Sequence, residues 1–192
     1  MTDVWLIVGL GNPGPRYSDT PHNAGARTVE LLASRLGGRF AMGKASALVA
    51  DVRSGEHRLL IARPSTYMNI SGEPVGRLAR YLKVDGDHIV VVHDDIDLPL
   101  GQLRIKLGGG NAGHNGLSSI QRHLGTPDFY RVRIGVGRPP AGGQDPADYV
   151  LAKPGREAQE AITQTQERAA DAVLALIEDG LERTMNEFNT RS

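Results

Sequence analysis

Polar side chains suited to acid–base chemistry gather in four segments, each at the end of an apolar run or just before a helical pattern. The segments are Asn12 to His22, Tyr67 to Asn69, His93 to Asp97 and Gly108 to Gly116. Because α/β proteins place binding and catalytic groups at strand ends and in the loops that follow them, we expect these segments to meet. The sequence therefore predicts one cleft that contains a histidine, a carboxylate and several amides.

His22 is the candidate base of this cleft. A neutral imidazole accepts a proton near neutral pH, and a carboxylate on its far nitrogen fixes the tautomer and stabilises the imidazolium. Asp94, which follows the apolar run 89–92, is the expected partner. An amide such as that of Asn12 can pair with a peptide backbone or stabilise an oxyanion. The chain has no cysteine and no G-x-S-x-G motif, so water is the expected nucleophile.

Each of these residues or segments, taken alone, also has an alternative interpretation. His22 would fit a loop histidine that only bonds the backbone, and Asn12 in Asn-Pro-Gly fits simple turn chemistry. The carboxylates of residues 93–97 would fit a magnesium site, although strand alternation directs Asp94 and Asp95 to opposite faces. Three further histidines are predicted to be solvated in turns or on helix surfaces: His57, His88 and His123.

The glycine-rich segment 108–117 is predicted to bind an anion. Three consecutive glycines leave backbone N–H groups uncovered, and the helix expected at 115–124 adds its positive end. Lys106 precedes the segment, while Arg131 and Arg133 alternate along a strand and share one of its faces. These groups would suit a phosphate. A flexible loop beside a solvated strand face is the open alternative.

The elements that must position these residues alternate between strands and helices. Apolar or alternating patterns predict strands at 4–8, 48–52, 58–62, 89–92, 103–107 and 132–136. Helical spacing predicts helices at 24–36, after Ser71 as N-cap, at 115–124, from about 157 to 177 and after Gly180. This order predicts a single α/β domain over 1–192, a mixed twisted sheet flanked by helices (an α/β/α sandwich), with C-terminal helices from about 156. The Pro- and Gly-rich segment 139–146 is expected to be a mobile surface loop.

The segment 9–14 matches G-x-G-x-x-G after a strand, which is the pattern of a dinucleotide site. Such a site needs a helix that begins at the glycines, and here Pro21 would lie inside that helix at a cost of about 3 kcal/mol or more. Glu30, the candidate for the acidic residue of that motif, lies in a helical pattern instead. We therefore expect the glycines to shape a loop that carries Asn12.

Composition narrows the function classes. The 192 residues include 22 basic and 22 acidic ones, so a nucleic-acid partner would be held by a local patch and not by overall charge. The absence of cysteine excludes disulfides and thiolate metal sites. No apolar run approaches membrane-spanning length and the N-terminus lacks a signal-peptide pattern, which predicts a soluble, cytoplasmic protein.

Six motifs follow one another between about Leu6 and Pro154. They are VGLGNPGPRY at 8–17, TPHNAG at 20–25, RPSTYMNISG at 63–72, VHDDIDLPLG at 92–101, KLGGGNAGHNGL at 106–117 and RVRIGVGRP at 131–139. In this order they resemble the bacterial-type peptidyl-tRNA hydrolases. The chain departs from the common pattern at Pro21, where many members have Arg, and at Asn111-Ala112, where a His-Gly pair is frequent.

The resemblance implies a monomeric, cytoplasmic enzyme that hydrolyses the ester between the peptide and the terminal ribose of peptidyl-tRNA. It implies no metal, no cofactor and no protein partner, and a role in recycling tRNA from aborted translation. Matched by motif, His22 would be the base that activates water, Asp94 its orienting carboxylate, and Asn12 the group that positions the water and the ester. The rival interpretations are a non-catalytic RNA-binding relative and a metal-dependent esterase or peptidase built on residues 93–97.

The same resemblance implies the substrate contacts. The peptidyl backbone and the tRNA terminus would be held by Asn69 and Asn115, and the cleft would be lined by Tyr17, Met68 and His114. Lys106 and Arg133 match the family's clamp for the tRNA 5′-phosphate, which agrees with the anion site predicted from the glycine-rich segment.

Overall fold

A computed structural model describes residues 2–189, and within them seven strands form one sheet in the order β2-β3-β4-β1-β5-β7-β6. The strands are β1 (Asp3–Gly9), β2 (Ala41–Met42), β3 (Ala47–Ser54), β4 (His57–Pro64), β5 (Ile89–Asp95), β6 (Leu103–Leu107) and β7 (Tyr130–Gly135). The four central strands, β4, β1, β5 and β7, run parallel, and antiparallel strands complete both edges. The predicted mixed sheet is therefore confirmed.

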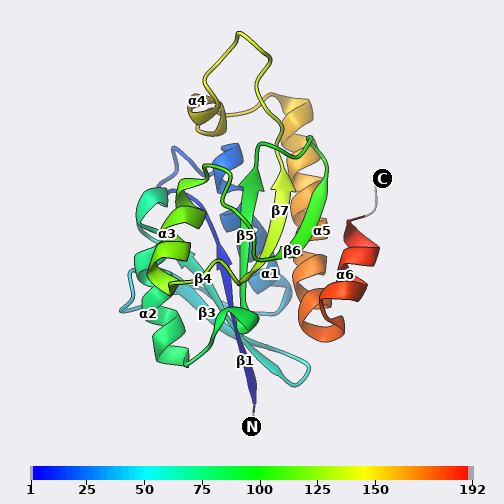
Figure 1. Cartoon of the computed structure of the whole chain (residues 1–192). Helices are drawn as coiled ribbons and strands as arrows, with labels where there is room; N and C mark the ends of the chain where they lie inside the picture. The colour runs from blue at the N-terminus through cyan, green and yellow to red at the C-terminus, as the bar shows by residue number, and fades with distance from the viewer. Residues whose placement is uncertain (1, 190–192) are drawn as a thin grey trace.

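Helices cover both faces of this sheet (Figure 1). They are α1 (Ala24–Arg35), α2 (Gly72–Leu82), α3 (Asn115–Leu124), α4 (Pro146–Val150), α5 (Arg156–Asp179) and α6 (Leu181–Phe188), with 3-10 turns η1 (Pro21–Asn23), η2 (Met68–Ile70) and η3 (Gly86–His88). Among the described residues, no helix is both long and apolar enough to cross a membrane.

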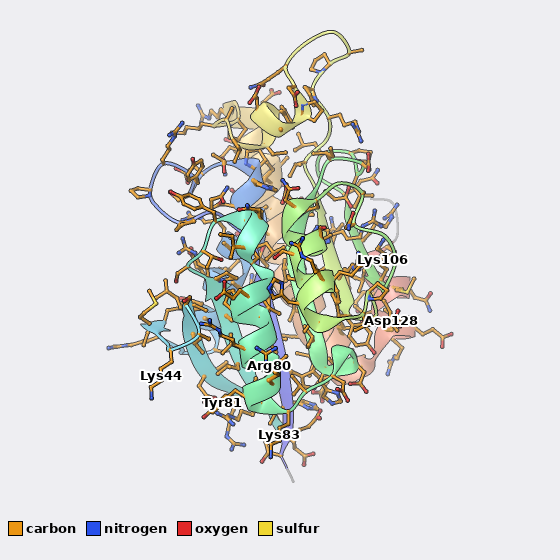
Figure 2. All side chains as sticks on the ribbon, turned by 60° about the vertical axis from the view of Figure 1, so that its left-hand side comes forward. Lys44, Arg80, Tyr81, Lys83, Lys106 and Asp128 are labelled. Carbon is orange, nitrogen blue, oxygen red and sulfur yellow. The ribbon has the colours of Figure 1, made fainter. Side chains whose placement is uncertain are left out.

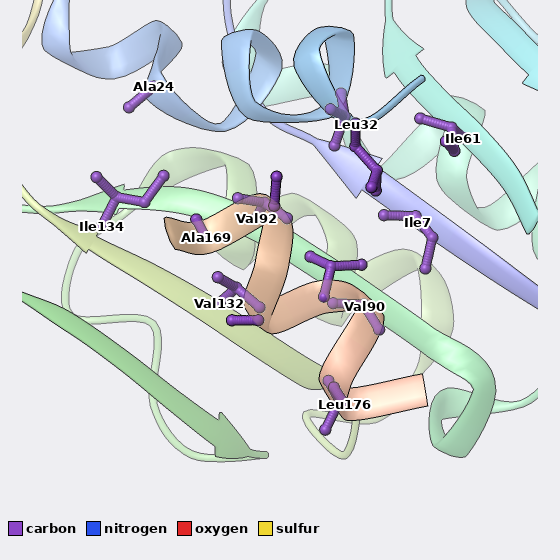
Figure 3. Close-up of a cluster of buried hydrophobic side chains, with 14 of the residues drawn as sticks. Ile7, Ala24, Leu32, Ile61, Val90, Val92, Val132, Ile134, Ala169 and Leu176 are labelled. Atoms are coloured by element: carbon purple, nitrogen blue, oxygen red, sulfur yellow. The ribbon is translucent and has the colours of Figure 1, made fainter. Parts of the chain in front are cut away.

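Strand alternation divides the core into two layers. Val90 and Val92 of β5 point to the face covered by α1 and α5, where they pack with Leu32 and Leu176 (Figure 3). Val91, between them in sequence, packs on the other face with the apolar residues of α2 and α3. Each fully buried side chain of this size contributes roughly 1.5–3 kcal/mol, so both layers hold β5 rigidly in the middle of the sheet.

The carboxyl ends of the central strands open a crevice. The chain leaves β1 toward α1 on one face of the sheet and leaves β4 toward α2 on the other. Neighbouring parallel strands whose connections diverge in this way leave a gap at their carboxyl ends, which is where α/β folds bind ligands. The predicted polar segments follow the ends of β1, β4 and β5 at this gap.

Glycine lets α1 approach the sheet closely at this edge. A Cβ on Gly25 would lie 2.0 Å from the carbonyl oxygen of Val92, and one on Gly9 would lie 2.4 Å from the carbonyl oxygen of Gly25. Backbone bonds then join the two parts: Leu10 N donates to Val92 O at 3.1 Å, and Ala26 N donates to Leu10 O at 2.9 Å. As predicted, the motif shapes a loop; its glycines seat a helix against strand ends.

The main strands and helices lie where the sequence predicts them, and four details differ. Ser71 occupies the N-cap position of α2, but its Oγ donates to Met68 O at 2.7 Å and caps no N–H group. The segment 139–146 leads into α4, which the sequence reading did not foresee. His57 and His88 are not simply solvated, because both bond the Asp3 carboxylate, at 3.0 and 2.7 Å.

Candidate active site

His22 and Asp94 meet at the carboxyl edge of the sheet. His22 lies in η1, whose first residue is Pro21, and Asp94 is the sixth residue of β5. The Nδ1 atom of His22 lies 2.8 Å from Oδ2 and 3.0 Å from Oδ1 of Asp94. The hydrogen bonds of the His22 ring to residues 2–189 both run through Nδ1, so Nε2 is left to face a substrate or water. The pair has the geometry of a base and its orienting carboxylate.

A second histidine bonds the same carboxylate. His114 is the N-cap residue of α3, and its Nε2 lies 2.8 Å from Asp94 Oδ1. Its Nδ1 accepts from the backbone N–H groups of Gly116 and Leu117, at 3.1 and 3.3 Å. The sequence suggested only that His114 lines the cleft. Its position just before a helix start was the available signal for a capping role.

Burial and these contacts set the charges of the site. Burial opposes ionisation of Asp94, which is 2% exposed, but the charges and hydrogen bonds of His22 and His114 hold its pKa well below the ordinary value. Burial also disfavours the imidazolium of His22, yet the nearby Asp94 carboxylate outweighs it and raises the pKa of His22. Asp94 is therefore ionised, and His22 is a stronger base than a free imidazole.

His93 contributes a third imidazole of a different kind. Burial, together with His114, lowers the pKa of His93 to about 3. Its Nδ1 lies 2.8 Å from the backbone oxygen of Asp94, which identifies Nδ1 as the protonated nitrogen. Its Nε2 is buried and has no partner within the described chain. His93 is thus a neutral structural group of the cleft wall and no base at neutral pH.

Asn12 is held with one side of its amide free. Its Oδ1 accepts from Met68 N at 2.7 Å, and its backbone N–H and C=O bond the side chain of Asn23 at 2.9 Å each. Asn23, which the sequence reading did not single out, therefore fixes the loop. Because Oδ1 is occupied, the NH₂ group of Asn12 remains as a donor that bonds no other described residue.

A cavity of about 370 Å³ lies in front of the histidines. Its walls come from η1, the end of β5, the loop before α3, and α4 with the residue before it. Asn115 and His114 line it beside His22, while Asn12, Tyr17, Met68 and Asn69 do not. Met68 is buried and Asn69 is exposed in η2.

The part of the cavity wall formed by α4 was not among the elements predicted from the sequence. Asp145 caps α4 by accepting from Ala147 N at 2.8 Å, and Pro146 follows at the first helical position. An Asp-Pro pair of this kind is a helix-start signal. Tyr149 ties α4 to the sheet through its hydroxyl, which donates to Val136 O at 2.7 Å. The cavity is therefore closed on one side by a helix anchored to the end of β7.

The three cations predicted to bind an anion near the glycine-rich loop are Lys106, Arg131 and Arg133, and they differ in whether their charged groups are free to do so. Arg131 is fully buried and donates to Gly110 O at 2.6 Å and Pro127 O at 3.1 Å, so it supports the loop and is not the exposed partner that strand alternation predicted. Arg133 bonds Asp95 at 2.9 Å. Burial and the charges of Arg133 and Arg131 lower the pKa of Lys106, as expected of cations gathered without enough anions. In Figure 2, Lys106 lies well away from Arg80 and Lys83.

The carboxylates of residues 93–97 do not converge on a metal site. Asp94 bonds the two histidines, Asp95 bonds Arg133 on the other face of β5, and Asp97 bonds Arg138. In the described part of the chain, one group of three potential ligands, from His22, Asp94 and His114, has its ligand atoms within 4.8 Å of one another. Those nitrogen and oxygen atoms already pair with each other at 2.8 Å.

Comparison with known proteins places this geometry in a family. The family model described as peptidyl-tRNA hydrolase matches residues 6–192. The peptidyl-tRNA hydrolase of Frankia alni is 49% identical over 185 residues, which cover 96% of this chain and 93% of the relative. That of Kineococcus radiotolerans is 46% identical over 196 residues and 98% of both chains. The crystal structure of peptidyl-tRNA hydrolase from Acinetobacter baumannii superposes with a TM-score of 0.93 at 34% identity, covering 100% of this chain and 97% of that one. The chain belongs to the peptidyl-tRNA hydrolase family.

Proposed function

We propose that this chain hydrolyses the ester bond between the peptide and the terminal ribose of peptidyl-tRNA, with His22 as general base on water. The observation that carries the proposal is the 2.8 Å bond from His22 Nδ1 to a buried, ionised Asp94 at the edge of a cavity. That bond keeps the proton on Nδ1 and leaves Nε2 as the acceptor.

The proposed reaction proceeds in two proton transfers. His22 Nε2 takes a proton from water while the water oxygen attacks the ester carbonyl carbon, and Asp94 stabilises the imidazolium that forms. The tetrahedral intermediate then collapses and expels the ribose oxygen, which takes the proton from His22. The products are the peptide carboxylic acid, which loses the second proton of the water to solvent and becomes the carboxylate, and a tRNA with a free terminal hydroxyl.

Asn12 is the proposed donor to the oxyanion. Its Oδ1 accepts from Met68 N, so the NH₂ group is the part of the amide left to donate to a substrate. A preorganised donor of this kind stabilises charge that develops in the transition state, typically by about 2.7–4 kcal/mol. Because the Asn23 side chain holds the Asn12 backbone, the position of this backbone does not have to form during the reaction.

The proposed substrate contacts lie on the tRNA side and on the peptide side of the ester. Lys106 and Arg133 are proposed to bind the tRNA 5′-phosphate, where their mutual repulsion would be relieved by an anion. Asn69 and Asn115 expose amides for the peptidyl backbone and the tRNA terminus, with Tyr17 and Met68 proposed at the margin of the cleft. Uncharged amides suit the acylated α-nitrogen of a peptidyl-tRNA, whereas the ammonium of an aminoacyl-tRNA would be poorly matched.

The deciding experiment is hydrolysis of N-acetyl-aminoacyl-tRNA by the wild type and by His22→Ala, with EDTA throughout. We expect EDTA-resistant activity in the wild type and its loss in the variant. A wild type that binds tRNA without hydrolysing it would favour the non-catalytic relative, and loss of activity with EDTA would favour a metal at the His22, Asp94 and His114 group. Equal hydrolysis of free and acetylated aminoacyl-tRNA would contradict the selectivity.

We further propose that the enzyme acts as a monomer in the cytoplasm and needs neither cofactor nor protein partner. Peptidyl-tRNA arises on ribosomes, so release of tRNA from aborted translation is the corresponding cellular role. His22, Asp94 and His114 bond one another within one copy of the chain, so the proposed base and its carboxylate need no second copy to come together. Sedimentation of the purified protein during turnover would test this directly.

A further inference from the structure

Both ring nitrogens of His114 are committed to partners inside the protein. Nδ1 receives the backbone N–H groups of Gly116 and Leu117, and an atom that accepts two donors carries no proton. The ring proton is therefore assigned to Nε2, which donates it to Asp94 Oδ1 at 2.8 Å. The backbone of α3 thus selects one tautomer of His114, and that tautomer suits the carboxylate.

The ring is also fixed by packing. It lies 4.9 Å from the ring of His22 and 5.2 Å from that of His93, centroid to centroid, and its side chain is only 9% exposed. A residue that hydrogen-bonds a substrate through its ring needs a free nitrogen. His114 has none, although it lines the cavity.

We infer that His114 is a positioning residue, which holds the Asp94 carboxylate against His22 and anchors it to the first turn of α3. The inference deepens the proposed function, because it rests on His22 as the base. In this arrangement His22 Nδ1 lies 2.8 Å from Asp94 Oδ2 and 3.0 Å from Oδ1, while His114 Nε2 lies 2.8 Å from Oδ1, so two neighbouring donors fix the orientation of the carboxylate.

The second donor also weakens Asp94 as an acceptor. A carboxylate that shares its charge between two N–H groups holds the proton on His22 less tightly than one with a single donor. The other titratable or charged groups around it are His93 on β5, Asp145 before α4, and Asp95, whose charge is paired with Arg133 on the opposite face of the strand. None of these takes the place of His114 at Oδ1.

Two substitutions separate the functions of the two nitrogens. In His114→Asn, the amide oxygen lies close to the place of Nδ1 and can still cap α3, but no group reaches Asp94. In His114→Gln, the longer side chain brings its NH₂ group to the place of Nε2 and keeps the donor, while the cap is lost. Each variant is therefore the control for the other.

For His114→Asn we expect kcat on N-acetyl-aminoacyl-tRNA to fall about tenfold with KM nearly unchanged. The acidic limb of the kcat/KM profile should move to higher pH by about half to one unit, because Asp94 then binds the His22 proton more tightly. His114→Gln should keep the wild-type limb and show a lower Tm. A raised KM with an unmoved limb in His114→Asn would make His114 a substrate-binding group. Wild-type kinetics in His114→Asn, with a lower Tm in His114→Gln as the only effect of either variant, would reduce it to a helix cap; either result overturns the inference.

Nitrogen-15 NMR of the imidazoles, recorded without substrate, keeps this test independent of catalysis. We expect His114 in the Nε2–H form, and a His22 titration midpoint that moves upward in His114→Asn. An Nδ1–H form of His114 would refute the inference whatever the activity. If the NMR results hold but His22→Ala still hydrolyses substrate, the proposed base is wrong while the support of Asp94 by His114 stands.

Discussion

Replacing Asp94 with Asn is the sharpest test of the His22–Asp94 pair. The two carboxylate oxygens accept from two imidazole nitrogens, but an amide offers only one oxygen. Its NH₂ group would face one of the two N–H donors, so one bond must break or one tautomer must change. If His22 changes, its proton moves to Nε2 and the atom that should accept a proton from water is blocked.

The size of the effect follows from the distance. A unit positive charge on His22, 2.8 Å from the carboxylate, is stabilised by about 6 kcal/mol at an effective dielectric constant of about 20, before the cost of burial is subtracted. A loss of roughly 4–5.5 kcal/mol in the transition state corresponds to a decrease in kcat of about 10³–10⁴. We expect a decrease of that size in Asp94→Asn.

The assay is single-turnover release of tRNA from N-acetyl-aminoacyl-tRNA, followed across pH. Asp97→Asn is the matched control, since this exposed carboxylate follows the same strand and pairs with Arg138. With the Asp94 charge gone, burial of His22 is no longer opposed, so the pKa of His22 should fall and the acidic limb should move to lower pH. A folded Asp94→Asn protein with kcat within tenfold of the wild type would refute the reasoning.

Three further outcomes are expected. Lys106→Ala should raise KM about 10- to 100-fold with kcat unchanged, and should reduce the salt dependence of tRNA binding by about one ion, as read from a log–log plot of affinity against salt; an unchanged slope would exclude a phosphate contact. Gly25→Ala should lower the free energy of unfolding by about 1–3 kcal/mol or more in urea melts, because its Cβ would lie 2.0 Å from Val92 O. Burial opposes ionisation of Asp3, but its hydrogen bonds to Trp5, His88 and His57 lower its pKa below the ordinary value of 3.8. Burial likewise disfavours the charged form of His88, but Asp87 and Asp3 raise its pKa above the ordinary value of 6.5. The Asp3–His88 pair should therefore stabilise the fold most between about pH 4 and 6.5, and lose that contribution when acid protonates Asp3 or when base deprotonates His88. An Asp3→Asn variant whose Tm deficit is the same at pH 5.5 and pH 8.5 would contradict that window.

Local patterns predicted the strand that carries the site. The apolar run 89–92 indicated a buried strand, and alternation correctly placed Asp94 and Asp95 on opposite faces, toward His22 and Arg133. These properties depend on residues next to each other in sequence. Pattern reasoning can therefore reach them.

Contacts between segments far apart in the sequence could not be predicted from local patterns. Alternation along β7 predicted that Arg131 and Arg133 share one face. It could not predict that the glycine loop and Pro127 bury Arg131. Likewise, the motif placed His114 in the cleft, but its bond to Asp94 depends on where α3 begins relative to β5. A five-residue helix such as α4 has too little periodicity to detect, and only its Asp-Pro start was visible.

The proposed catalytic pair joins residues 72 positions apart, and this has a consequence for how activity would arise during folding. His22 precedes α1, whereas Asp94 lies on β5, which pairs with β1 in the sheet. The chain that forms α1, the β3–β4 hairpin and α2 lies between the two strands in sequence. Contacts of such long sequence separation form slowly and late, because the intervening chain must be ordered first. Recovery of hydrolysis during refolding should therefore report the docking of β5 onto β1. During its own synthesis the chain is itself a peptidyl-tRNA, and until β5 has emerged from the ribosome it lacks the carboxylate that the proposed mechanism requires.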